Sequence, residues 1–376
     1  MTGALSGIRI IEIAGIGPGP FCGMMLADHG AEVIRVERLV GDPLSGGPLA
    51  RSRKSIAVDI RKPEGAAIVR DLARGADGLF EGNRPGVMER LGLGPDILLK
   101  DNPKLVYGRM TGWGQTGPLA HAAGHDINYI SVAGALHGCG TADGPPTPPV
   151  NYLGDFGGGG MLLAFGMLAG LLAVKNGGKG QVIDCAMTDG AALLTTMIWG
   201  FLGQGLWRDE SGVNMLDTGA HFYNVFETSD GKWVSIGAIE PQFYRLLREK
   251  LGLEAREDFD AQMNPAAWGT LKKELQAIFR TKTRDEWAAL LEGTDVCFGP
   301  VLSFREAARH PHNVARETFV EAGGVTQPAP APRYSASGTR APSPPAEIGA
   351  DTDEILAALG RDAEEIKALK AAGVAR

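Results

Sequence analysis

The chain has 376 residues, of which 44% are hydrophobic and 22% charged, and its formal net charge is −7. This length accommodates two domains, or one large domain with an insertion, and the composition is that of an ordinary soluble globular protein. The negative charge argues against a nucleic-acid partner and against a polybasic membrane anchor.

The first eighty residues alternate between strand and helix signals. They contain strand-like runs at 8–14, 32–37 and 77–81, a Gly/Pro turn at 15–20, and helical stretches at 21–29 and 63–74. Strands separated by helices at this spacing predict an α/β fold with a doubly wound, Rossmann-like parallel sheet. The chain enters its first strand without a cationic and apolar leader, so we expect no signal peptide.

The turn Gly-Ile-Gly-Pro-Gly-Pro at 15–20 invites comparison with a dinucleotide-binding loop, but the match is weak. Pro18 and Pro20 remove two of the backbone amides that a pyrophosphate needs, and the third glycine falls at the wrong spacing. A nicotinamide-dependent oxidoreductase is therefore a distant alternative.

The rest of the chain divides into a second unit and a return segment. The run at 161–174 is apolar and predicts a buried helix, because a membrane span needs about 20 residues. Further signals are helical at 191–207, strand-rich at 222–239, helical at 242–292, linker-like at 327–345 and helical at 352–372. We predict a large domain from residues 1–200, a smaller inserted α/β domain from 221–315, and a return to the large domain over 325–376.

The four cysteines, Cys22, Cys139, Cys185 and Cys297, form no CxxC pair and no ligand spacing with a histidine. We therefore expect free thiols in a reducing cytoplasm, with neither a disulfide nor a metal.

Two motifs carry candidate chemistry. Gly-His-Asp-Ile-Asn-Tyr at 124–129 supplies His125, and Gly-Asp-Phe-Gly-Gly-Gly-Gly at 154–160 supplies Asp155. Four consecutive glycines before an apolar helix suggest backbone brought close to a ligand, at a helix start that stabilises negative charge. Taken singly, His125 fits a core histidine and Asp155 a helix cap. Together they predict a site that moves protons beside a developing anion.

These motifs resemble the racemase branch of the family III CoA-transferase superfamily. The segments Arg-Met-Thr-Gly-Trp-Gly-Gln-Thr-Gly-Pro at 109–118 and Gly-Ala-Ile-Glu-Pro-Gln-Phe-Tyr at 237–244 belong to the same pattern, which spans nearly the whole chain. The resemblance implies inversion at C2 of 2-methylacyl-CoA thioesters in lipid and fatty-acid metabolism. It implies His125 and Asp155 as the acid/base pair, with Glu240 accepting a hydrogen bond from the imidazole.

The reaction passes through an enolate, whose oxygen needs positioned donors worth about 3–4 kcal/mol each. The backbone amides of 155–157 are the candidates. Asp126 caps a helix or assists His125, and we favour the structural role. Apolar methionines offer a permissive acyl surface, although each also fits ordinary core packing; they are Met24, Met25, Met187, Met197 and Met215.

The substrate's CoA carries phosphates, which suit arginine and backbone amides. The resemblance implies CoA contacts at Arg38, Val58, Asp59, Ile60, Arg61, Gly82, Asn83, Arg84, Arg90, Gly124, Asp126, Ile127, Asn128 and Tyr129. A further basic cluster, Arg51, Arg53 and Lys54, is predicted to face the adenine end. CoA is part of the substrate, so we expect no separate cofactor.

The resemblance also implies an interlocked homodimer, with His125 and Asp155 from one subunit and Glu240 from its partner. Two other functions stay open. In a CoA transferase Asp155 would be a nucleophile, although such an enzyme needs no base at His125. A non-catalytic acyl-CoA carrier would bind the thioester without exchanging its C2 proton.

Overall fold

The computed structural model describes residues 3–41 and 46–376, which form two compact units. The first unit contains residues 1–133, 150–194 and 312–376, and the second contains 134–149 and 195–311. The second unit therefore includes residues 134–149, which the sequence analysis assigned to the large domain.

A six-stranded sheet forms the centre of the first unit, in the order β3-β2-β1-β4-β5-β6. Its strands are β1 (Arg9–Ile13), β2 (Glu32–Glu37), β3 (Lys54–Ala57), β4 (Gly78–Glu81), β5 (Val106–Thr111) and β6 (Gln181–Ala186). Every neighbouring pair is parallel, with Ile11 opposite Ile34 in β2 and Leu79 in β4. The predicted doubly wound α/β fold is confirmed, and the sheet contains three strands, β3, β5 and β6, that the sequence pattern did not predict.

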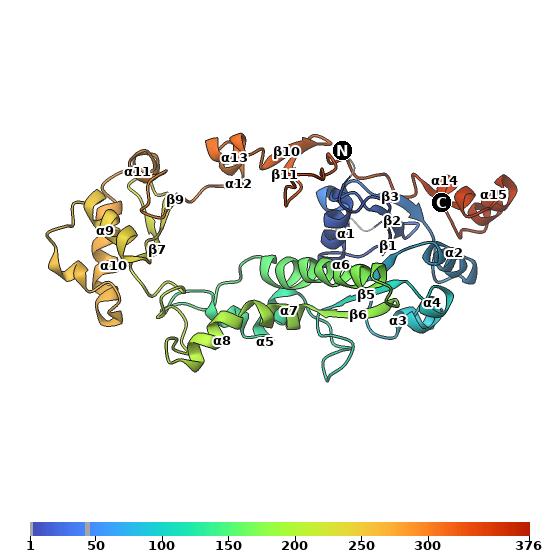
Figure 1. Ribbon diagram of the computed structural model, residues 1–376, viewed down its shortest axis with the longest axis horizontal. Coiled ribbons are helices and arrows are strands. Elements are labelled where there is room, and N and C mark those ends of the chain that lie inside the picture. The colour runs from blue at the N-terminus through green and yellow to red at the C-terminus, as the bar shows by residue number, and fades with distance from the viewer. Residues whose placement is uncertain (1–2, 42–45) are drawn as a thin grey trace. The chain divides into compact units, whose positions relative to one another are not determined.

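Helices cover both faces of this sheet (Figure 1). They are α1 (Pro18–Asp28), α2 (Pro63–Arg74), α3 (Val87–Arg90), α4 (Pro95–Asp101), α5 (Asp126–Val132), α6 (Leu162–Lys175) and α7 (Met187–Leu194). One hydrophobic core joins the sheet to α1 and α6, and includes Leu26 and Met167. The other joins it to α2, α4 and the chain's C-terminal end, and includes Ile68 and Leu356. Burial on both faces explains why the strands are nearly continuous apolar runs.

The glycine run 157–160 lies inside a helix. A π-helical segment, Tyr152–Met161, leads directly into α6. A Cβ at Gly158 would lie 2.6 Å from the backbone nitrogen of Ala191 in α7, and one at Gly160 would lie 2.7 Å from the carbonyl oxygen of Pro18 in α1. The glycines therefore allow three helices to pack backbone against backbone.

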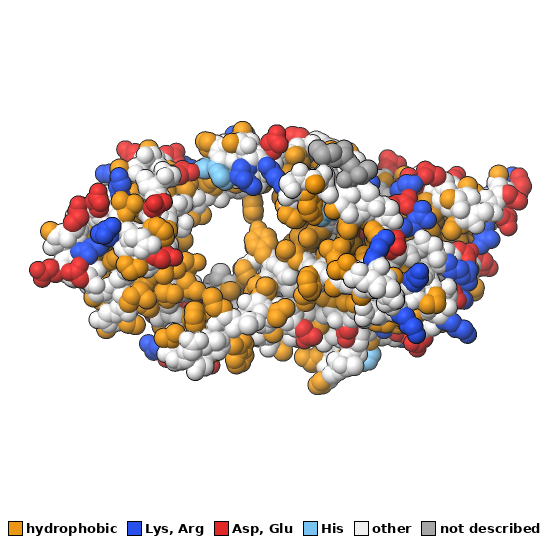
Figure 2. Space-filling model, in the orientation of Figure 1, with side chains coloured by type: hydrophobic (Ala, Val, Ile, Leu, Met, Phe, Trp, Pro, Cys, Tyr) orange, Lys and Arg blue, Asp and Glu red, His pale blue; other side chains and the backbone are white. Residues whose placement is uncertain are grey.

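The predicted buried helix is only partly buried. The helical run Tyr152–Lys175 is long and apolar enough to cross a membrane by length and composition, and 44% of its most apolar window is buried. Its outer face repeats at helical spacing and is exposed at Met161 (52%), Phe165 (69%) and Leu172 (62%). Figure 2 shows hydrophobic side chains on the surface in the region of helix α6. This face of the first unit is an apolar surface of the single chain.

The second unit has a three-stranded antiparallel sheet backed by helices. Its main elements are α8 (Thr196–Gly203), β7 (Tyr223–Glu227), β8 (Trp233–Gly237), α9 (Pro241–Lys250), α10 (Pro265–Phe279), α11 (Arg284–Leu291), β9 (Phe298–Pro300) and α12 (Phe304–Ala307). The core of this unit contains Phe222, Trp268 and Trp287.

The return segment runs through α13 (Pro311–Ala315), β10 (Phe319–Ala322) and β11 (Val325–Pro328) before the C-terminal helices. The predicted single helix over 352–372 is two, α14 (Thr352–Ala358) and α15 (Ala363–Ala371), separated at Gly360, whose φ is +85°. A left-handed conformation of this kind ends a helix.

The predicted basic cluster at the adenine end is wrong for its two arginines, Arg51 and Arg53. Arg51 is buried and pairs with Asp28 at 2.5 Å, while Nη1 donates to Gln327. Arg53 is also buried and pairs with Glu12. These arginines anchor strand β3 and the return segment, because a buried charge requires a partner.

Candidate active site

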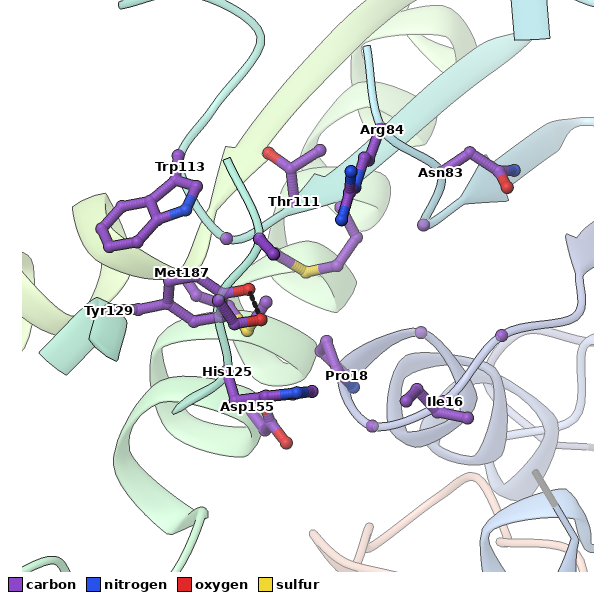
Figure 3. A pocket seen from close by; sticks show the side chains of 18 of the residues that line it. Ile16, Pro18, Asn83, Arg84, Thr111, Trp113, His125, Tyr129, Asp155 and Met187 are labelled. Atoms are coloured by element: carbon purple, nitrogen blue, oxygen red, sulfur yellow. Dashed lines mark hydrogen bonds between the residues drawn. The ribbon is translucent and has the colours of Figure 1, made fainter. Parts of the chain in front are cut away.

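A cavity of about 710 Å³ opens at the carboxyl ends of β1, β4 and β5. From β1 the sheet is extended first toward β2 and β3 and then, on the other side, toward β4, β5 and β6, and ligands of open α/β sheets bind at this switch point. His125, Asp155, Tyr129, Arg84 and Met187 line the cavity together (Figure 3).

His125 is the residue that precedes helix α5. Its backbone N–H donates to Asn128 Oδ1 at 3.1 Å, and its carbonyl accepts from the amide of Asn128 at 2.8 Å. This capping arrangement fixes the backbone of the histidine and leaves the imidazole exposed toward the cavity. His125 is therefore not a core histidine.

Asp155 lies in the first turns of the π-helical segment. Burial raises the pKa of its carboxyl, and the nearby charge of Asp126 raises it further. Asn151 Nδ2 donates to Asp155 Oδ2 at 3.0 Å, and this bond and His125 act in the opposite direction on the pKa. The balance favours a protonated carboxyl relative to an ordinary aspartate.

Asp126 connects the two candidate motifs. It is 6% exposed, and its Oδ2 accepts the amides of Gly154 and Asp155, each at 2.7 Å. The contacts therefore agree with the structural role favoured for Asp126, since its carboxylate binds the backbone of the Asp155 segment. The same bonds correct the expectation for the enolate donors, because the amide of Asp155 already has an acceptor. The amides of Phe156 and Gly157 lie within the π-helical segment, where each N–H bonds to the carbonyl five residues earlier, so none of the three expected amides is left free.

The Gly/Pro turn at 15–20 also borders this site. Gly17 precedes α1 with a φ of +67°, and a Cβ there would lie 3.1 Å from Asp155 Oδ2. Glycine is required here for both its backbone conformation and its close approach to the carboxyl.

A second cavity of about 710 Å³ adjoins the first, and the two share Ile13, Ala14, Arg38 and Asn83 in their linings. Of the residues predicted to contact CoA, the first cavity is lined by Arg38, Gly82, Asn83, Arg84, Gly124, Asn128 and Tyr129. The second is lined by Arg38, Val58, Asp59, Ile60, Arg61, Asn83 and Arg90. Asp126 and Ile127 lie outside both linings.

The electrostatics of the second cavity suit an anion. Arg38 and Arg90 are exposed there, while Arg61 forms two hydrogen bonds with Asp59, at 2.8 and 3.0 Å. The guanidinium of Arg61 lowers the pKa of Asp59.

Glu240 belongs to the second unit, where it precedes helix α9. It is exposed, and its carbonyl accepts the amide of Tyr244 at 3.0 Å. Burial, followed by the charge of Glu240, raises the pKa of the Cys297 thiol, so the two side chains are neighbours.

The sequence reasoning missed part of the cavity lining. Trp113 packs edge-on against Tyr129 with ring centroids 4.8 Å apart, and Thr111 and Met110 also line the cavity. The segment 109–118 supplied the signal, since these residues leave the carboxyl end of β5.

The fold and its joined cavities define a Rossmann-like α/β protein with a ligand site at the switch point of its sheet. A model of CoA-transferase family III matches residues 5–352. The chain therefore belongs to CoA-transferase family III.

Relatives within that family are similar over almost the whole chain. The identity to alpha-methylacyl-CoA racemase of Mus musculus is 45% over 370 residues, covering 96% of this chain and 95% of that protein. The Homo sapiens racemase is 42% identical over 369 residues, again covering 96% and 95%. A crystal structure of a CAIB/BAIF family protein from Brucella suis matches with a TM-score of 0.83 and 26% identity, covering 96% of this chain and 100% of that one.

Proposed function

We propose that this protein is a racemase that inverts C2 of 2-methylacyl-CoA thioesters by proton transfer through an enolate. The observation that carries the proposal is the meeting of His125 and Asp155 in one cavity (Figure 3). Supporting it are two relatives, at 45% and 42% identity, that are named alpha-methylacyl-CoA racemase.

Inversion needs one group to remove the C2 proton and another to return a proton to the opposite face. The neutral imidazole of His125 acts as the base, and the carboxylic acid of Asp155 acts as the acid; the roles exchange in the reverse direction. Asp155 suits the acid role because burial and Asp126 raise the pKa of its carboxyl. Asn151 donates to Oδ2, which leaves Oδ1 to carry the proton.

The enolate oxygen carries the developing charge. The positive end of the helix that begins at Tyr152 is proposed to stabilise this charge. Two acid/base groups and this helix end complete the proposed chemistry, so the proposal requires no metal and no cofactor beyond the CoA of the substrate.

The CoA moiety is proposed to follow the second cavity, from Asn83 toward Arg38 and Arg90, with its phosphates on the arginines. We further propose the cytoplasm as the location, on the four free thiols.

We propose that the working form is a homodimer in which the partner supplies Glu240 to the imidazole of His125. The exposed apolar face of the helical run 152–175, with Phe165 69% and Leu172 62% exposed, supports burial against a second copy. Light scattering should give twice the mass of the 39.6 kDa chain. A monomer, or a protein that requires lipid vesicles to remain soluble, would count against the dimer.

Mixed dimers test the shared site. His125→Ala and Glu240→Gln homodimers should both be inactive or severely slowed, whereas a heterodimer of the two regains one competent site. No recovery in heterodimers of verified composition would contradict the contribution of Glu240 from the partner.

The direct test is epimerisation of one pure epimer of a 2-methylacyl-CoA, with the mixture resolved by chiral chromatography. A CoA transferase remains the second candidate, favoured by the family name and by more distant relatives that are named CoA-transferases, and would use Asp155 as a nucleophile. That enzyme would require a carboxylic acid acceptor, and hydroxylamine would trap an aspartyl adduct. We expect epimerisation without acceptor and without adduct.

A further inference from the structure

The segment 82–86 is the junction between the two cavities. It connects β4 to α3, and its Asn83 lines both cavities. Arg84 points into the first cavity, with Asn83 beside it at the end of β4 (Figure 3). At the other end of the segment, Val87 and Arg90 of α3 line the second cavity. Any movement of this segment changes both cavities.

Glu81, the last residue of β4, forms a hydrogen bond with the beginning of this segment. Its side chain is 0% exposed. Its Oε2 accepts the backbone N–H of Asn83 at 2.6 Å, and its Oε1 accepts Arg109 Nε at 3.3 Å. Arg109 in turn donates from Nη1 to Glu89 Oε1 of α3 at 2.7 Å. The chain Glu81–Arg109–Glu89, here called the carboxylate bridge, ties both ends of the segment to strand β5.

Protonation of Glu81 would disturb this bridge. Both carboxylate oxygens already face a donor, so a proton on either oxygen competes with the N–H of Asn83 or with Arg109. The charged and titratable groups that face Glu81 are Arg109 and Tyr107 of β5 and Glu89 of α3. Burial raises the pKa of Glu81 to about 7, so both forms are accessible near neutral pH.

We propose that Glu81 is a positioning residue for CoA: its carboxylate form fixes the segment 82–86 against Arg109, and CoA binds that form in preference to the protonated one. Glu81 acts through Asn83 and does not itself reach the ligand, because its side chain is fully buried. This inference rests on the proposed acyl-CoA function. By linkage, CoA binding then promotes release of a proton from Glu81.

The direction of proton transfer distinguishes this arrangement from a simple field effect. The negative phosphates of CoA, acting only through space, would favour proton uptake by Glu81. A carboxylate that positions the binding segment predicts proton release. The two accounts therefore differ in sign.

The experiment is calorimetric titration with free CoA, in buffers of different ionisation enthalpy, from about pH 6 to about pH 8. Wild type should bind more tightly as the pH rises, by about fivefold beyond the change seen in Glu81→Gln, because a charged acceptor gives a stronger hydrogen bond than a neutral one. Near neutral pH, wild type should release more protons than Glu81→Gln. Glu354→Gln, which removes an exposed carboxylate paired with Lys54, is the matched control and should behave as wild type.

Equal pH dependence and equal proton release in wild type and Glu81→Gln would overturn the inference and leave the proposed function intact. Failure of every protein to bind CoA would overturn the proposed function as well. A second measurement needs no variant: infrared difference spectra of protein labelled with ¹³C in glutamate. Addition of CoA at neutral pH should remove the band of a protonated glutamate carboxyl, whereas an unchanged or growing band contradicts the proposal.

Discussion

Replacement of Asp126 by asparagine tests the link between the two candidate motifs. The carboxylate accepts two backbone N–H groups through one oxygen, each at 2.7 Å, and its other oxygen is buried without a hydrogen-bond partner among the described residues. In the better of its two orientations the asparagine keeps both bonds, but they become neutral and each weakens by about 1 kcal/mol. Its amide nitrogen is then a buried donor without an acceptor, which costs about 1–3 kcal/mol more.

The free energy of unfolding should therefore fall by about 3–5 kcal/mol, which for a chain of 376 residues lowers the melting temperature by about 4–6 °C. The assay is thermal unfolding by calorimetry at neutral pH. Asp96→Asn is the matched control, because Asp96 is exposed in the first turn of α4 and surface changes of this kind stay within about 0.5 kcal/mol. An Asp126→Asn melting temperature within about 2 °C of wild type would refute the reasoning.

The same substitution should alter the pH profile of kcat/KM. Asp126 raises the pKa of Asp155, so its neutralisation should move the limb that belongs to Asp155 to lower pH. An unmoved limb in a folded variant would show that Asp126 holds only the backbone.

Three further results follow from the contacts. Asn151→Ala removes the donor to Asp155 Oδ2, so the same limb of kcat/KM should move to higher pH, opposite to Asp126→Asn; a shift in the same direction would contradict the assignment. Gly158→Ala should destabilise the protein by about 1–3 kcal/mol through contact with Ala191, whereas Gly200→Ala, which has open space in helix α8, should be neutral or stabilising; equal effects in denaturant titrations would contradict the backbone packing. For Glu81, the pKa is raised from its ordinary 4.5 to about 7, so its contribution to stability is fully present below about pH 4.5 and is lost as the pH rises through about 7. Glu81→Gln should thus gain up to about 3 kcal/mol relative to wild type across that window, and a constant difference would contradict the raised pKa.

Much of the fold could be predicted because local patterns of apolar and turn residues indicate its strands and helices. Apolar runs of strand length, separated by helical stretches and turn residues, predicted five elements of the first unit: β1, β2, β4, α1 and α2. Strand β3 was not predicted, because Arg53 and Lys54 at its beginning suggest a charged surface. The burial of Arg53 depends on Glu12, which is distant in sequence and adjacent only in the folded sheet.

The candidate site was predictable where a motif carries it and not where tertiary contacts do. His125 and Asp155 are recognisable in their motifs, and the structure places both in one cavity. The bonds of Asp126 to the amides of Gly154 and Asp155 require helix α5 and the π-helical segment to meet, which no local pattern reports. The glycine run was misinterpreted for the same reason, since its neighbours are the backbones of α1 and α7.

Catalysis by two acid/base groups at C2 is tested most directly by isotope exchange. Either epimer of a 2-methylacyl-CoA, incubated with the protein in D₂O, should give both epimers with deuterium at C2, and His125→Ala should abolish the exchange while CoA still binds. Epimerisation with full retention of protium, or binding without any exchange at C2, would contradict the account.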